Sequence, residues 1–196
     1  MWTNLAPPIP VGASDTNGSL AQDLGQEYFF RGATSATGGP VTVRGYRLVY
    51  NNSGATLAAG AAVVEQMTLG IRNGYVTTTI VSNDPSYVGH VPSEFGTGTV
   101  AIAAYFLVQI SGPGKGQFAN TVATLVAPTT DTACGMLGTA TTAGYVQLLN
   151  KTATGTAAAT INDIGALIQA TLSFTTQSAA VTAAGQLGTI DLRIRN

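Results

Sequence analysis

The stretch TVAIAAYFLVQI, residues 99–110, decides the fold that we expect for this chain. It is the longest strand candidate in the sequence, and apolar residues occupy both its odd and its even positions. A strand with two apolar faces is buried on both sides, which predicts a central place in a sheet. The residues GPGKG at 112–116 follow directly and predict a tight connection after that strand.

Other strand patterns surround this stretch. Apolar and polar residues alternate over 41–44, and after Gly45 the alternation resumes over 46–50 in the opposite phase. A change of phase at a glycine predicts a β-bulge. The dipeptide Asn73-Gly74 predicts a two-residue hairpin between residues 69–72 and 75–81. Further candidate strands are residues 61–67, 118–125, 145–149 and 189–194, while residues 157–172 fit a helix or a strand, with the strand favoured because Gly165 weakens a helix.

Many short strands with Gly and Pro turns predict an all-β domain, a barrel or a sandwich, over residues 41–196. Residues 1–40 differ, because their prolines favour extended backbone, so we expect an extended N-terminal arm there. The aromatic cluster at 28–30 fits either an anchor of that arm or an ordinary first strand of the core. The candidate partner-binding residues are Trp2, Leu5, Pro7, Pro8, Tyr28, Phe29 and Phe30.

Charged residues are scarce throughout the chain. They make up 9% of its 196 residues, where an ordinary soluble domain has about 25%, and the formal net charge is -1. Between Glu94 and Asp191 the charged side chains are Lys115, Asp131, Lys151 and Asp163. Covering such a surface costs little free energy, because few ions have to leave water. We therefore expect a protein whose outside contacts other protein molecules.

The same composition argues against several other partners. Lys and Arg form no basic stripe, so we expect no nucleic-acid partner. No run of apolar residues approaches the roughly 18 that a membrane span needs, so we expect no membrane partner. The first residues, MWTNLAPP, lack the basic and apolar segments of a secretory signal, so we expect no such signal and synthesis in the cytoplasm.

Catalytic chemistry is hard to place on these residues. His90 is the only histidine and Cys134 the only cysteine. A nucleophilic mechanism would need His90 as its base, but this residue lies in the apolar context VGHVP. Zinc requires several Cys and His ligands, and the acidic residues are too scattered for a calcium loop. We expect no enzymatic activity, no catalytic residue, no cofactor and no metal.

Two segments carry a resemblance: SGATLAAGAAVV at 53–64 and AYFLVQISGP at 104–113, with a loop holding Gly89 and Pro92 between them. Here the chain resembles the capsid decoration (cement) proteins of tailed bacteriophages, in particular the lambda-type head-decoration group. The resemblance implies a β-tulip or SH3-like fold and a non-enzymatic virion protein that binds the outer capsid surface as a homotrimer. Its partners would be the major capsid protein and further copies of itself. The chain departs from the smaller members in its length and in the arm before Pro40.

Two other classes of protein fit the same composition. Another phage structural β-module, such as a tail tube, head fibre or tail fibre, would be equally poor in charge. A carbohydrate-binding module or small hydrolase would need converging acids or aromatic residues, and the only tryptophan, Trp2, lies in the expected arm. The residues leave open the symmetry of the assembly and the choice between capsid and tail.

Overall fold

The structure is a computed structural model that describes residues 6–31, 43–69, 73–79, 84, 86–119, 136–149, 170–171 and 187–193. Within these residues the chain is all-β, as the sequence predicts. The strands are β1 (Ser14–Asp15), β2 (Glu27–Arg31), β3 (Val43–Asn51), β4 (Leu57–Ala58), β5 (Ala62–Glu65), β6 (Tyr75–Thr77), β7 (Tyr87–His90), β8 (Thr99–Val100), β9 (Tyr105–Gln117), β10 (Met136–Thr139), β11 (Val146–Leu149), β12 (Ala170–Thr171) and β13 (Leu187–Arg193). Short 3-10 helices are η1 (Gly18–Asp23), η2 (Met67–Leu69) and η3 (Ser93–Phe95).

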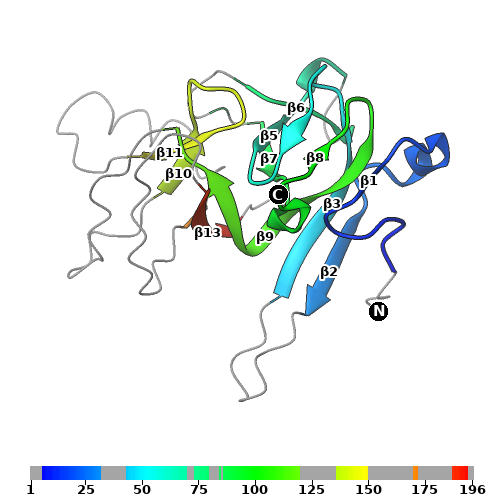
Figure 1. Cartoon of the computed structure of the whole chain (residues 1–196), viewed down its shortest axis with the longest axis horizontal. Helices are drawn as coiled ribbons and strands as arrows, with labels where there is room; N and C mark the ends of the chain where they lie inside the picture. Colours follow the sequence, from blue (N-terminus) through cyan, green and yellow to red (C-terminus); the bar gives the residue numbers. More distant parts are fainter. Residues whose placement is uncertain are drawn as a thin grey trace.

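Five strands close into a barrel (Figure 1). β3 pairs with β9, β9 with β7, β7 with β5 and β5 with β6, all antiparallel, and β6 returns to β3 as a parallel neighbour. A barrel of so few strands is narrow, so small and β-branched side chains fill most of its interior. This interior cluster consists of Val49, Leu57, Ala61, Val63, Val76, Val88, Val91, Val100, Phe106, Val108 and Ile110.

β3 and β9 are buried on both faces. On β9, Phe106 belongs to the interior cluster while its neighbour Leu107 packs on the opposite face. On β3, Val49 and Leu48 divide in the same way. The central, two-faced strand predicted from the sequence is therefore confirmed in residues 105–110. The predicted bulge is confirmed as well, because the register between β3 and β9 shifts immediately after Gly45.

Residues 6–31, here called the outer layer, cover the other face of β3 and β9. β1 pairs with β9, and β2 pairs with β3 along its whole length (Figure 1). The buried residues between this layer and the barrel, here called the outer cluster, are Ile9, Leu20, Tyr28, Tyr46, Leu48, Tyr105 and Leu107. Of the two interpretations of residues 28–30, the structure contains the strand. Residues 32–42, with the expected domain boundary at 40, lie outside the described residues.

The second half of β9 belongs to an extension of the sheet. Residues 111–117 pair with β13, and β12, β10 and β11 continue the sheet beyond it. β11 and β13 confirm the strands predicted near 145–149 and 189–194. The predicted strands at 75–81, 118–125 and 157–172 lie partly outside the described residues.

The start of the long strand was predicted wrongly. β9 begins at Tyr105 rather than Thr99, and only Thr99–Val100 form the separate strand β8. The cause lies in the turn between them, where Ala103 has a φ of 55° and so leaves the extended conformation. Asn51 holds this turn, since its Nδ2 group donates to the carbonyl oxygen of Ala101 at 2.9 Å.

The tight connection expected at 112–116 is also wrong, because these residues continue β9. Gly112 has a φ of 83°, which bends the strand, but β13 follows the bend and stays paired with it. The Nε2 group of Gln109 donates to the carbonyl oxygens of residues 111, 112 and 113 at 3.2, 3.2 and 2.9 Å. A buried glutamine thus supports a bend that the local sequence alone presents as a turn.

The hairpin predicted at Asn73-Gly74 has the wrong partner. β6 pairs with β5, and η2 occupies part of the segment expected to be its partner strand. Gly74 has a positive φ of 77°, but Asn73 does not, so a type I′ turn is not formed. Instead the Asn73 side chain accepts a hydrogen bond from the Tyr75 N–H at 2.7 Å and donates one to the Gln66 carbonyl at 2.9 Å.

Candidate functional site

The structure separates the expected partner-binding residues by their exposure. Trp2 and Leu5 lie outside the described residues. Tyr28 is 5% exposed and belongs to the outer cluster, and Phe30 packs edge-on against a buried tyrosine with ring centroids 5.5 Å apart. Phe29, on the opposite face of β2, is 42% exposed. Pro7 is half-buried and Pro8 exposed. Whether these residues bind a partner stays a prediction.

Exposed apolar side chains gather where β2 lies beside β3. Phe29 pairs with Gly45, and its ring comes within 2.8 Å of the position that a Cβ of Gly45 would occupy. Val43, two residues before Gly45 on the same face, is 47% exposed. We call Phe29 and Val43 the β2–β3 patch. It is an apolar surface built on a pair of hydrogen-bonded strands.

A second group of exposed apolar side chains lies near the other end of β3. Met67 and Leu69 of η2 and Ile102 of the β8–β9 turn are each about half exposed. Hydrogen bonds place η2 and the β8–β9 turn at this end of β3. Asn52 donates to Gln66, which directly precedes η2, and Asn51 donates to Ala101 in the turn. The nine residues of β3 separate the two groups by roughly 27 Å.

The charged side chains of β3 are both paired. Arg44 lies 2.7 Å from Glu94 at the surface, and Arg47 lies 2.5 Å from Glu27 with its side chain only 11% exposed. An exposed pair of this kind contributes little to stability, whereas breaking a largely buried one leaves an uncompensated charge. The β2–β3 region therefore presents apolar groups and two paired arginines, and the exposed Arg31 of β2 lies directly opposite Val43.

His90 is a buried structural residue. It is 1% exposed, its Nε2 atom contacts the Tyr87 hydroxyl, and its Nδ1 atom lies 3.1 Å from the Gly60 carbonyl oxygen. Burial lowers the pKa of His90 from 6.5 to about 4, against the opposing effect of that carbonyl. The neutral imidazole therefore donates through Nδ1 and accepts from the tyrosine through Nε2. Both nitrogens are used, so neither is placed to act on a substrate.

No group of three or more His, Cys, Asp or Glu residues in the described ranges is placed to hold a metal ion. Cys134 lies outside them. Among the described helices, none is long and apolar enough to cross a membrane.

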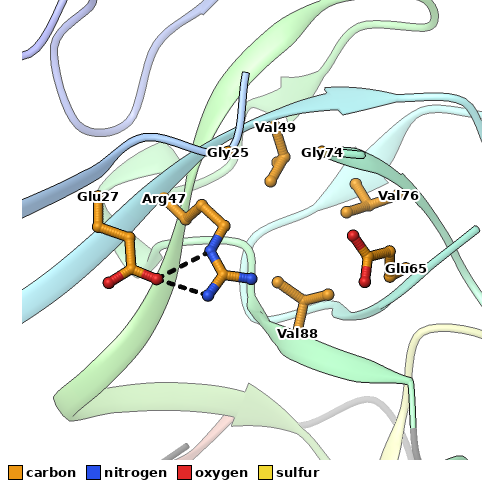
Figure 2. A pocket seen from close by; sticks show the side chains of 8 residues that line it. All are labelled: Gly25, Glu27, Arg47, Val49, Glu65, Gly74, Val76 and Val88. Atoms are coloured by element: carbon orange, nitrogen blue, oxygen red, sulfur yellow. Dashed lines mark hydrogen bonds and ion pairs between the residues drawn. The ribbon is translucent and has the colours of Figure 1, made fainter. Parts of the chain in front are cut away.

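One cavity with polar and apolar walls lies against the barrel strands. It measures about 60 Å³ and is lined by Gly25, Glu27, Arg47, Val49, Glu65, Gly74, Val76 and Val88. Figure 2 shows the Arg47 guanidinium and the Glu65 carboxylate reaching into it from opposite sides, with valine side chains between them. The position of Arg47 follows from strand alternation, since it stands two residues before Val49 of the interior cluster.

Sequence reasoning missed this cavity. Arg47 and Glu65 are 18 positions apart in the sequence and carry no motif, and only the pairing of β3, β6 and β5 brings them together. The alternation over 46–50 gave no signal for it, because Arg47 falls on a position where a polar side chain is expected. No family profile, no curated protein and no solved structure matches this chain.

Proposed function

We propose that this chain is a non-enzymatic structural protein of a phage virion that binds the outer surface of the capsid and stabilises it as a homotrimer. The observation that carries the proposal is the β2–β3 patch, an exposed apolar surface on a pair of hydrogen-bonded strands in a protein with very few charges. Apolar surface of this kind gains free energy when a partner covers it. The resemblance of residues 53–64 and 104–113 to capsid decoration proteins supports the same function.

The absence of catalytic activity is part of the proposal and rests on how His90 is used. Both ring nitrogens of the only histidine are occupied inside the barrel wall. A general base has to reach the proton that it removes. A protein that reinforces a shell needs contact area and rigidity, and a closed barrel with two buried clusters provides both.

The first test is the mass of the native protein, alone and with capsids. Sedimentation of the purified protein should give a trimer, and the trimer should co-sediment with capsids assembled from the major capsid protein of the same phage. A stable monomer with no affinity for these capsids would refute the proposal. Rings or filaments of the isolated protein would instead indicate a tail-tube or fibre module.

The second test locates the docking surface with matched variants. Val43→Thr removes apolar surface from the β2–β3 patch while keeping a β-branched residue, and we expect capsid affinity to fall by roughly tenfold, since buried apolar area contributes on that order. Ile102→Thr makes the same kind of change at the other end of β3 and should leave affinity unchanged. Truncation of residues 1–5 tests the N-terminal segment. A longer truncation, of residues 1–30, would also remove most of β2, which pairs with β3. Equal effects of the two Thr variants would exclude the patch as the docking surface.

A further inference from the structure

The cavity between Arg47 and Glu65 has the properties of a small binding site, and it is independent of capsid docking. Two of its three charged lining residues, Arg47 of β3 and Glu65 of β5, enter from opposite sides (Figure 2). Side chains of β3, β6 and β7 form an apolar wall between them, namely Val49, Val76 and Val88. A volume of about 60 Å³ has room for roughly four to six water molecules, and therefore for a ligand of about five non-hydrogen atoms.

Each charged group has hydrogen-bonding capacity that the described residues leave unused. Arg47 donates to the Oε1 atom of Glu27 from Nε at 3.2 Å and from Nη2 at 2.5 Å. Its Nη1 group makes no hydrogen bond to any described residue, nor does the Glu65 carboxylate. The cavity therefore offers a donor on one side and an acceptor on the other.

Charge selects among the groups that could fill this space. A carboxylate would accept from Arg47 but would face the like charge of Glu65. An ammonium would pair with Glu65 but would leave Nη1 of Arg47 without an acceptor. A primary carboxamide satisfies both, because its oxygen accepts from Nη1 and its NH₂ group donates to the carboxylate.

We propose that this cavity binds a primary carboxamide, with the oxygen on Arg47, the nitrogen on Glu65 and an aliphatic stem along the valines. A glutamine side chain has the matching size and chemistry. The carboxamide can come from a free small amide or from an Asn or Gln side chain of another protein, and the same hydrogen bonds recognise both.

The test is a titration of the isotope-labelled full chain, followed by NMR, with three probes of similar size: propionamide, propionate and propylammonium. Propionamide should shift the Arg47 Nε–H signal and the Val76 and Val88 methyl signals. The two ions should bind roughly tenfold more weakly or not at all, because each loses a hydrogen bond to a charged group. Tighter binding of either ion, or the absence of propionamide-dependent shifts, would overturn the proposal.

A matched pair of variants confirms the site. Glu65→Leu removes the acceptor while keeping a side chain of similar size, and propionamide shifts should disappear from a spectrum that otherwise stays folded. Glu94→Leu makes the same substitution outside the cavity and should leave them intact. If Glu65→Leu does not fold, comparison of the three probes on the unmodified chain still decides the question.

Two further titrations separate the sources of the carboxamide. The capped peptide acetyl-Gly-Gln-Gly-amide represents a side chain of another protein, and free L-glutamine represents a solute. Shifts at the same valines from either probe support the site, and the one that binds more tightly indicates the source. Loss of the capsid function would not affect this result, since the titration uses no capsids.

Discussion

The barrel interior and the outer cluster are built from the same two strands and yet have different compositions. On their inner face β3 and β9 present mainly apolar side chains, Val49, Phe106, Val108 and Ile110, together with Arg47. On their outer face they present Tyr46 and Tyr105, and the outer layer adds Tyr28. The interior side chains are mostly at 0% exposure, while the three tyrosines keep 3%, 7% and 5% of their surface accessible.

This difference in composition follows from the structure that covers each face of β3 and β9. A closed barrel surrounds its interior with backbone on all sides, so a hydroxyl there would find few partners. The outer layer is one segment of chain, and a tyrosine beneath it can bury its ring while its hydroxyl reaches the rim. Burial raises the pKa of Tyr28, Tyr46 and Tyr105, which keeps all three neutral at pH 7. The barrel should therefore be the rigid unit and the outer layer the part that opens first.

Truncating a phenylalanine of the barrel interior and one on the exposed face of β2 gives the largest expected contrast. Phe106→Ala empties a fully buried position of the barrel and should lower the free energy of unfolding by about 4 kcal/mol. Phe29→Ala, at a position that is 42% exposed, should lower it by less than about 1 kcal/mol. Guanidinium denaturation measures both, and equal losses would mean that the barrel is not the main source of stability.

Acid should act on the barrel through His90. The pKa of this side chain is about 4 in the folded protein and 6.5 when it is free, so between these values the unfolded chain binds a proton that the folded chain does not. Its contribution is therefore fully present above pH 6.5 and is lost towards pH 4, by about 3 kcal/mol. Urea denaturation from pH 7 to 4 measures the loss. His90→Gln should flatten this slope, and an unchanged slope in the variant would assign the effect to other groups.

Loosening the outer cluster should give a smaller effect than a change in the barrel interior, and a local one. Leu20 of η1 is 8% exposed in the outer cluster, and Leu20→Ala should cost about 2 kcal/mol. We expect amide hydrogen exchange to accelerate in residues 14–31, while the amides of β5 and β7 keep their protection. Acceleration spread evenly over the barrel would show that the two regions unfold as one.

Local signals in the sequence were sufficient for the alternation that builds the strands. Residues 105–110 have two apolar faces, which predicts their burial, and the change of phase at Gly45 predicts the bulge that the structure contains. The same reasoning failed at Gly112, where it read a glycine beside a proline as a turn. A glycine with positive φ can bend a strand as well as end it. Gln109 and β13 decide between these outcomes, and both act from outside the local segment.

The candidate sites were much less accessible to sequence reasoning than the strands. An aromatic run such as 28–30 predicts contact, but alternation puts Tyr28 in the outer cluster and Phe29 in the β2–β3 patch. Which of the two faces met solvent depended on the register with β3. The cavity gave almost no local signal, because its donor and acceptor come from different strands.

By itself the sequence determined an all-β chain with little charge and with strands apolar on both faces, because residue type and alternation are local properties that each segment carries alone. Only the tertiary structure decided that β6 would return to β3 and close the barrel, that His90 would be buried with both nitrogens used, and that Arg47 would face Glu65. These results depend on contacts between residues far apart in the chain. Such contacts are selected by the packing of the whole core, which no single segment encodes.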